Sequence, residues 1–307
     1  MTSIPTTSIL VNRASKYKLN NDKLIPVIGY GLYLVPKGDA ARLTYEALKA
    51  GYRHVDTAEY YNNAVEAAQG VASFLNDHPE VERGDIWFTT KLTNEQQGYE
   101  ATVAALEKIG KELKPYIKYV DLVLLHSPLT SKEKRLGSWK ALQEHTVDND
   151  ALWVKSIGVS NFGVDHLKEL FEAEHFYIKP VLNQLELHPW LPRVELRQFL
   201  VKHDILPEAY SPLTQGYKLD DPELVSLAEK YKVNKVEILL RWAFLQGFIV
   251  LVKSNKPERI AQNIDVLPVD TYGKIDLELE ILDALDKPES NEVLTWGNVD
   301  PTLFKDT

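Results

Sequence analysis

The chain has 307 residues, with 35 Lys and Arg, 44 Asp and Glu and no Cys, and its formal net charge is -9. The absence of Cys excludes disulfide bridges and thiolate metal sites, and the acidic balance argues against nucleic acid as a partner. No stretch approaches the roughly 18 apolar residues that span a bilayer, and the N-terminus lacks the layout of a signal peptide. We expect a cytoplasmic protein without a membrane partner, as a monomer or a weak homodimer.

The first predicted element is a β-hairpin near the N-terminus. Residues 16–19 and 23–25 form its two arms and flank Asn20, Asn21 and Asp22. Asn and Asp tolerate the left-handed backbone conformation of a tight turn, so this tripeptide is suited to join two antiparallel strands.

Eight short apolar runs follow in chain order, separated by segments with helical spacing. Near-continuous apolar runs are typical of parallel strands that are buried on both faces. The intervening segments repeat apolar residues as amphipathic helices do, and the one over 40–48 is expected to end at Gly51. The eight runs comprise residues 27–31, 54–56, 86–91, 120–126, 156–159, 181–186, 205–210 and 248–252.

Eight alternating units predict an α/β fold, the closed (β/α)8 or TIM barrel, in a single domain over residues 1–307. We expect the hairpin to close the bottom of this barrel. An open doubly wound sheet is the alternative, although it usually has fewer strands. Active sites of such barrels lie at the C-terminal ends of the strands. Polar residues stand at seven of these ends: Asp56, Lys91, His126, Ser160 with Asn161, Gln184, Tyr210 and Lys253.

Asp56, Tyr61, Lys91 and His126 together have the chemistry for carbonyl reduction. Hydride addition to a carbonyl creates an alkoxide that needs a proton, and Tyr61 would donate it if the Lys91 ammonium lowered its pKa. Asp56 would pair with Lys91, and His126 would orient or polarise the carbonyl. Each residue also has a structural explanation, as a half-buried Tyr, a solvated Lys, or an Asp that caps a helix.

A basic cluster follows the eighth apolar run. Lys253, Ser254, Lys256 and Arg259 flank a predicted helix start, with Pro257 in the first turn. Basic side chains and the free N–H groups of a helix N-terminus bind phosphate well. In an acidic chain this cluster favours an anion pocket, and a solvated helix start is the alternative.

Two further patterns carry less weight. The GxG at residues 29–31 lacks the third glycine of a dinucleotide fingerprint, so a nicotinamide cofactor would have to be held in another way. Glu186 and His188 lie two residues apart, but no further ligands cluster near them in the sequence, and we predict no metal site. His54 and Tyr60 are assigned to structure.

Six motifs in order resemble the aldo-keto reductase superfamily, over about residues 16–290. Residues 51–63, GYRHVDTAEYYNN, are similar to the family signature GxRHxDTAxxYxN. The segments LLHSP (124–128), GVSNF (158–162), NQLELHP (183–189), YSPL (210–213) and the run over 253–263 are similar to its later motifs. The resemblance implies a barrel enzyme that uses NADPH to reduce a small carbonyl compound.

The resemblance also implies a role for each matching residue. Tyr61 would be the general acid, and Lys91, Asp56 and His126 would complete a catalytic tetrad. The implied cofactor contacts are Ser160, Asn161 and Gln184 at the nicotinamide carboxamide, Tyr210 stacked on its ring, Ser211 and Leu213 at the pyrophosphate, Lys253, Ser254, Asn255 and Arg259 at the 2′-phosphate, and Gln262 and Asn263 at the adenine.

Departures from the family pattern bear on the substrate. Tyr33 stands where the family usually has Trp, and Thr93 and Ser127 stand where it often has aromatic residues. With Trp296, these residues are assigned to a more open substrate pocket. The HSP motif and the tail over 296–304 are similar to fungal reductases of α-dicarbonyl compounds, including conjugated polyketone, ketopantoyl lactone and α-keto amide reductases. We therefore expect a ketone beside a second carbonyl as substrate.

Two other functions compete with carbonyl reduction. Some proteins with this fold act as cofactor-binding channel subunits, so the chain could be an NADPH-binding regulatory module with little turnover. A barrel hydrolase with paired carboxylates, for which Glu186 and Asp56 would supply the pair, is the second alternative.

Overall fold

The computed structural model describes residues 6–146 and 154–306, and its centre is a closed barrel of eight parallel strands. The strands pair in the order β10-β11-β4-β5-β6-β7-β8-β9, and the pairing of β9 with β10 closes the ring. The predicted (β/α)8 barrel is confirmed, and the open sheet is excluded. The barrel strands are β4 (Ile28–Gly31), β5 (His54–Asp56), β6 (Trp87–Leu92), β7 (Leu122–Leu125), β8 (Ile157–Ser160), β9 (Leu182–Glu186), β10 (Leu206–Tyr210) and β11 (Ile249–Val252).

The strands agree with the eight apolar runs to within two residues at either end. Every residue of β5, β6, β7 and β9 is buried, because the helices cover the outer face of the barrel and side chains fill its interior. Strand β7 is wholly apolar, as expected, whereas β5, β6 and β9 also bury polar residues.

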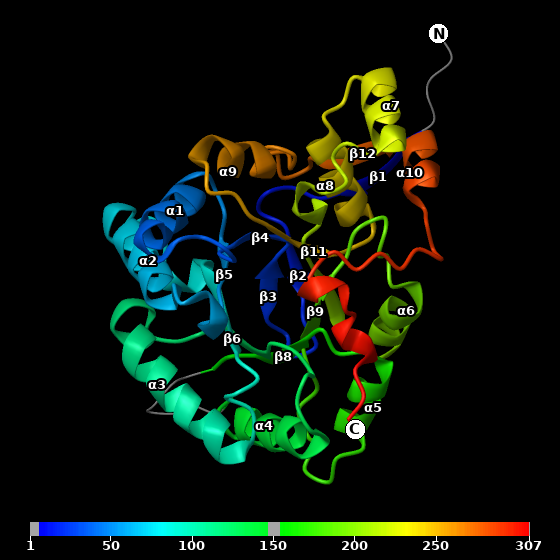
Figure 1. Ribbon diagram of the computed structural model, residues 1–307. Helices are drawn as coiled ribbons and strands as arrows, with labels where there is room; N and C mark the ends of the chain where they lie inside the picture. The colour runs from blue at the N-terminus through cyan, green and yellow to red at the C-terminus, as the bar shows by residue number, and fades with distance from the viewer. Residues whose placement is uncertain (1–5, 147–153, 307) are drawn as a thin grey trace.

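Helices surround the barrel (Figure 1). Helix α1 shows the pattern, because its buried positions recur at helical spacing and it ends just before Gly51, whose φ of 111° suits a residue without a side chain. Among the described residues, no helix has the length and apolar content to cross a membrane. The helices are α1 (Lys37–Lys49), α2 (Ala64–Asp77), α3 (Tyr99–Ile117), α4 (Lys132–Glu144), α5 (Val164–Phe171), α6 (Val194–Lys202), α7 (Pro222–Tyr231), α8 (Lys235–Leu245), α9 (Pro257–Ile264) and α10 (Leu279–Leu285).

The predicted hairpin consists of β2 (Lys16–Lys18) and β3 (Leu24–Pro26), with Asp22 in the left-handed conformation at the turn. Figure 1 shows it across the middle of the ring of helices. Leu19 and Ile25 of the hairpin pack in one apolar cluster with the first residues of four barrel strands, Trp87, Leu122, Leu182 and Ile249. The hairpin thus closes the N-terminal end of the barrel, as expected.

An additional two-stranded sheet was not predicted. Strand β1 (Thr6–Leu10) pairs antiparallel with β12 (Lys274–Glu278), and Figure 1 shows the pair beside α8 and α10. Ile275 and Leu277 alternate with more exposed neighbours, as in a half-buried strand. The pairing joins the N-terminal strand to the strand that precedes α10, and no candidate site residue lies on it.

Candidate active site

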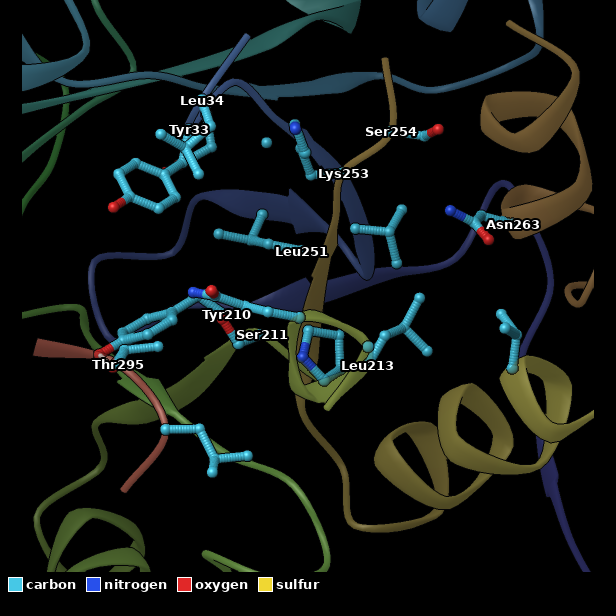
Figure 2. A pocket seen from close by; sticks show the side chains of 18 of the residues that line it. Tyr33, Leu34, Tyr210, Ser211, Leu213, Leu251, Lys253, Ser254, Asn263 and Thr295 are labelled. Carbon is cyan, nitrogen blue, oxygen red and sulfur yellow. Dashed lines mark hydrogen bonds between the residues drawn. The ribbon is translucent and has the colours of Figure 1, made fainter. Parts of the chain in front are cut away.

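A large cavity opens at the C-terminal ends of the barrel strands, where the site was expected. Its volume is about 1660 Å³, larger than a compact ligand requires. Figure 2 shows that Tyr33 and Thr295 lie at one side of the cavity and Asn263 at the other. The cavity therefore has room for an extended molecule that reaches from the strand ends to α9.

Three of the four predicted catalytic side chains meet through one ammonium group. The Lys91 Nζ donates to Asp56 Oδ1 at 2.6 Å, to the Thr57 carbonyl at 2.9 Å and to the Tyr61 hydroxyl at 3.3 Å. Lys91 is fully buried on β6, Asp56 ends β5, and Tyr61 ends the short helix η1 (Glu59–Tyr61). The ion pair with Asp56 offsets part of the cost of removing the ammonium from water.

The fourth side chain, His126, follows β7 and packs edge-on against the Tyr61 ring, with the ring centroids 5.7 Å apart. Burial lowers the pKa of His126 well below its usual value, and the Lys91 charge adds to this shift. The imidazole is therefore neutral. Its Nδ1 has no hydrogen-bond partner among the described residues, and His126 and Tyr61 both line the cavity.

The electrostatics of Tyr61 correct one expectation. We expected Lys91 to lower the Tyr61 pKa, but burial raises this pKa well above its usual value and the negative charge of Asp56 raises it further. The phenol is removed from water, which disfavours phenolate even with an ammonium 3.3 Å away. Tyr61 is therefore a protonated hydroxyl at neutral pH, held against a cation.

The residues assigned to the carboxamide also come together. Asn161 Nδ2 donates to the His126 carbonyl at 2.9 Å and to Ser160 Oγ at 3.0 Å, and its Oδ1 accepts from the Tyr210 hydroxyl at 2.8 Å. Gln184 Nε2 donates to Asp56 Oδ2 at 2.9 Å, so it joins this group to the tetrad. These carboxamide residues line the cavity together with Asp56, Tyr61 and His126, whereas the fully buried Lys91 does not.

The opposite end of the cavity is basic. Lys253, Lys256 and Arg259 line it at the start of α9, and none of them forms an ion pair within the described part of the chain. Partial burial lowers the pKa of Lys253. The other residues predicted to contact cofactor also line the cavity: Ser211, Leu213, Ser254, Asn255, Gln262 and Asn263.

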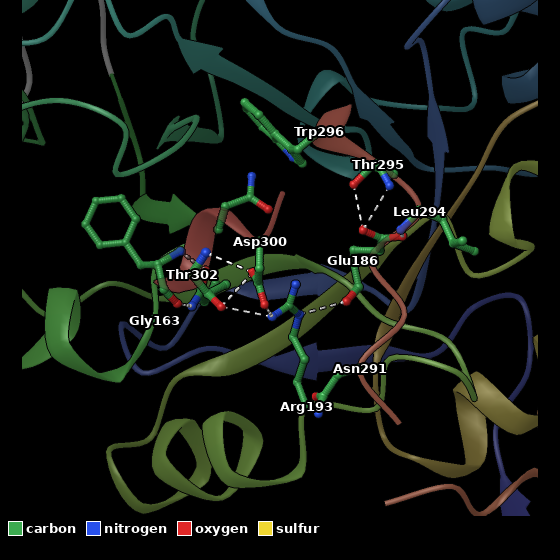
Figure 3. Close-up of polar contacts among 12 residues, drawn as sticks. Gly163, Glu186, Arg193, Asn291, Leu294, Thr295, Trp296, Asp300 and Thr302 are labelled. Carbon is green, nitrogen blue, oxygen red and sulfur yellow. Dashed lines mark hydrogen bonds and ion pairs between the residues drawn. The ribbon is translucent and has the colours of Figure 1, made fainter. Parts of the chain in front are cut away.

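A segment near the C-terminus forms one wall of the cavity, and Figure 3 shows how it is anchored. The Glu186 carboxylate accepts from Leu294 N at 2.9 Å and from Thr295 Oγ1 at 2.6 Å, while Arg193 donates to Asp300 at 2.8 Å. These contacts place Trp296, at the start of η4 (Trp296–Asn298), where its Nε1 donates to the Tyr210 hydroxyl at 3.0 Å.

The close approach of this segment requires a glycine. A Cβ at position 163 would lie 2.0 Å from the Thr302 carbonyl oxygen, so no residue larger than glycine fits at this position. The same contacts account for Glu186, which we considered as a partner of Asp56 or as a metal ligand with His188. Its carboxylate holds the C-terminal segment and His188 Nε2 instead.

The predicted substrate pocket is partly corrected. Tyr33 and Trp296 line the cavity, but Thr93 and Ser127 do not. Ser127 is fully buried and its hydroxyl donates to Asn94 Oδ1, while Thr93 N donates to Gln96 Oε1. Both residues therefore serve the loop after β6 rather than the pocket.

Two residues, one at the cavity and one beneath it, were not identified from the sequence. Tyr60, assigned to structure, lines the cavity with its ring 5.4 Å from that of His126. Glu208, buried on β10, accepts a hydrogen bond from Gln184. The sequence feature that could have identified Glu208 is its charge within the otherwise largely apolar run over residues 205–210. Among the described residues, no group of three or more His, Cys, Asp or Glu could hold a metal ion.

Comparisons with known proteins agree with this geometry. A model of the Aldo/keto reductase family matches residues 28–278. An uncharacterized oxidoreductase of Saccharomyces cerevisiae is 37% identical over 92% of this chain and 98% of its own length. The glyoxal reductase of Bacillus subtilis is also 37% identical, over 94% of this chain and 97% of its own length.

Solved structures are similar over most of the chain. The crystal structure of an aldo/keto reductase from Brucella melitensis is 40% identical with a TM-score of 0.78, over 91% of this chain and 99% of that one. A Bombyx mori aldo-keto reductase in complex with NADP is 29% identical with a TM-score of 0.78, over 94% of this chain and 98% of that one.

Proposed function

Because the chain belongs to the aldo/keto reductase family, we propose that it is an NADPH-dependent carbonyl reductase in which Tyr61 donates the proton. One observation carries this proposal. Lys91 contacts both Asp56 and the Tyr61 hydroxyl at one end of a long cavity, and the cations at its other end form no ion pair with any described residue. A proton donor and an anion site are thus held in one cavity.

The residues present fit a phosphorylated dinucleotide. Lys253, Lys256 and Arg259 lie beside the N-terminus of α9, and their charges have no protein partners within the described residues. Such a site suits the 2′-phosphate that distinguishes NADPH from NADH. At the other end, Asn161 and Gln184 offer amide groups to the nicotinamide carboxamide. When bound, NADPH supplies the hydride. Support also comes from the Bombyx mori relative, which was solved with NADP.

The chain's own residues supply the proton and orient the substrate. The neutral His126 and the Tyr61 hydroxyl both face the cavity, and together they would bind the carbonyl oxygen. Tyr61 gives its proton to the oxygen as negative charge develops there, and the Lys91 ammonium stabilises the phenolate that remains. Asp56 holds Lys91 in place through the contact at 2.6 Å.

We further propose an α-dicarbonyl compound, such as a conjugated polyketone or ketopantoyl lactone, as the substrate class. A second carbonyl withdraws electrons from the first and makes it a better hydride acceptor. The Bacillus subtilis relative, 37% identical, is named a glyoxal reductase, and glyoxal carries two adjacent carbonyl groups. Tyr33, Tyr60 and Trp296 would bind such a small planar substrate by contact with their rings.

The test is nicotinamide absorbance with NADPH and, in parallel, isatin, ketopantoyl lactone and a simple aldehyde, with NADH as control. We expect rapid oxidation of NADPH by the two dicarbonyl compounds and little oxidation of NADH. Turnover of the aldehyde alone would contradict the substrate class but not the activity. Tight NADPH binding without turnover of any carbonyl would contradict the reductase proposal.

A further inference from the structure

Glu208 is a buried carboxyl group beneath the candidate active site that the chemistry above does not use. It lies in the middle of β10 and is fully buried. In the pairing of β10 with β9, Glu208 stands directly opposite Gln184. Neighbouring residues in register on parallel strands direct their side chains to the same face, so both enter the barrel interior. Glu208 is therefore built into the support of Gln184.

Gln184 is held by two acceptors at once. Its Nε2 donates one hydrogen to Asp56 Oδ2 at 2.9 Å and the other to Glu208 Oε2 at 2.8 Å. Asp56 forms an ion pair with the Lys91 ammonium at 2.6 Å, and as a carboxylate it has only acceptor oxygens, so the group at its Oδ2 is a donor. The chemistry of the neighbours thus requires the nitrogen of the Gln184 amide to point into the barrel.

The amide oxygen of Gln184 is then the polar atom of this side chain that is available to a ligand in the cavity. No donor among the described residues contacts Oε1, although Gln184 lines the cavity wall. A single acceptor would allow the amide to rotate about one hydrogen bond, whereas two acceptors fix its plane. With both hydrogens occupied, Gln184 can act toward a ligand only as an acceptor.

We propose that Glu208 is a positioning residue that fixes the plane of the Gln184 amide and so presents Oε1 as an acceptor for the N–H groups of the nicotinamide carboxamide. This inference rests on the proposed function, because it requires that the cavity bind NADP(H). It assigns Glu208 no contact with cofactor or substrate.

The surroundings of Glu208 keep it uncharged, which suits this role. Burial raises the pKa of Glu208 to about 8, and the negative charge of Asp56 contributes to this rise. His54 faces it with Nε2 at 3.8 Å from Oε1, and burial lowers the pKa of His54 to about 3, so the imidazole is neutral. A neutral carboxyl accepts from Gln184 without adding a second anion beside the ion pair of Asp56 and Lys91.

The test compares the affinities of NADP+ and its 3-acetylpyridine analogue, in which a methyl group replaces the carboxamide nitrogen. Binding is followed by quenching of Trp fluorescence, because Trp296 lines the cavity. We expect the wild type to bind NADP+ about threefold to tenfold more tightly, the range for one neutral hydrogen bond. Glu208→Leu should reduce this preference to less than about twofold, and Glu208→Gln, which keeps an acceptor oxygen, should retain it.

A second measurement does not depend on the Leu variant folding. In wild-type protein labelled with 15N-glutamine, both side-chain N–H groups of Gln184 should exchange slowly with solvent, because both are hydrogen-bonded and buried. Rapid exchange of either group would overturn the inference.

The outcomes separate the inference from the proposed function. Equal affinity of the wild type for the two nucleotides, or an undiminished preference in Glu208→Leu, overturns the role of Glu208 and leaves the reductase proposal in place. Failure of the wild type to bind either nucleotide overturns both.

Discussion

Replacing Lys91 with Met separates the structural from the chemical role of the buried ion pair. The Lys91 ammonium is fully buried and donates to Asp56 at 2.6 Å and to the Thr57 carbonyl at 2.9 Å. Met fills similar space but leaves the Asp56 carboxylate buried without a cation. Breaking one side of a buried pair costs about 3–5 kcal/mol. We expect Lys91→Met to lower the free energy of unfolding by that amount at pH 7 and to abolish carbonyl reduction.

The matched control is Lys91→Met combined with Asp56→Asn, assayed by urea denaturation and by NADPH oxidation. The double variant has no buried charge at this position, so it should recover most of the lost stability and none of the activity. In the single variant, loss of the cation raises the folded-state pKa of Asp56. The loss in free energy of unfolding of the single variant should therefore be largest at neutral pH. It should shrink as the pH falls toward the unfolded pKa of Asp, about 3.9.

Two results would refute this reasoning. A single variant as stable as the wild type would mean that Asp56 does not depend on Lys91. Recovery of carbonyl reduction in the double variant would mean that the ammonium has no part in the chemistry, since only its stabilising role would have been restored.

Three other variants test separate parts of the candidate site. Lys253→Gln with Arg259→Gln should weaken NADPH binding at least about tenfold more than NADH binding, because two charges leave the 2′-phosphate site; equal weakening would contradict that assignment. Glu208→Gln removes a group whose pKa rises from 4.5 to about 8 on folding. The folded wild type retains a proton there that the unfolded chain loses, so wild-type stability falls as the pH rises through this interval. The free energy of unfolding of the variant relative to wild type, measured by urea denaturation, should increase from pH 5 to pH 8 by at most about 5 kcal/mol and then level off. A pH-independent difference would contradict a buried neutral carboxyl at position 208. Glu186→Gln weakens the anchor of Leu294 and Thr295, so limited proteolysis of the C-terminal segment should accelerate and the KM for the carbonyl should rise more than the Kd for NADPH; unchanged cleavage would show that the anchor is dispensable.

The sequence predicts the barrel well because its strands are buried on both faces. Most of these strands are near-continuous apolar runs, and the residue that ends each run lies at the site end of the barrel. Asp56 and Tyr210 end their strands as expected, and Lys91 lies one residue before the end of β6. Asp56, Lys91 and His126 could therefore be grouped from strand ends, whereas Tyr61 lies in η1 beyond β5 and was added for the chemistry of its side chain.

The contacts that depend on distant segments were not predictable in this way. Glu186 holds Leu294 and Thr295 across more than a hundred residues, and nothing in the local pattern of either segment indicates the other. Glu208 was missed because strand patterning treats an isolated charge in an apolar run as noise. The direction of the Tyr61 pKa shift was wrong because it depends on the degree of burial, which the sequence does not give.

The most direct test of the central claim compares wild type and Tyr61→Phe for NADPH oxidation with an α-dicarbonyl substrate, with NADPH affinity measured in parallel. The variant removes only the hydroxyl that contacts Lys91 at 3.3 Å and keeps the ring beside His126. If Tyr61 donates the proton, reduction falls by at least about a hundredfold while NADPH binds with nearly unchanged affinity. Reduction at the wild-type rate by Tyr61→Phe would contradict the account.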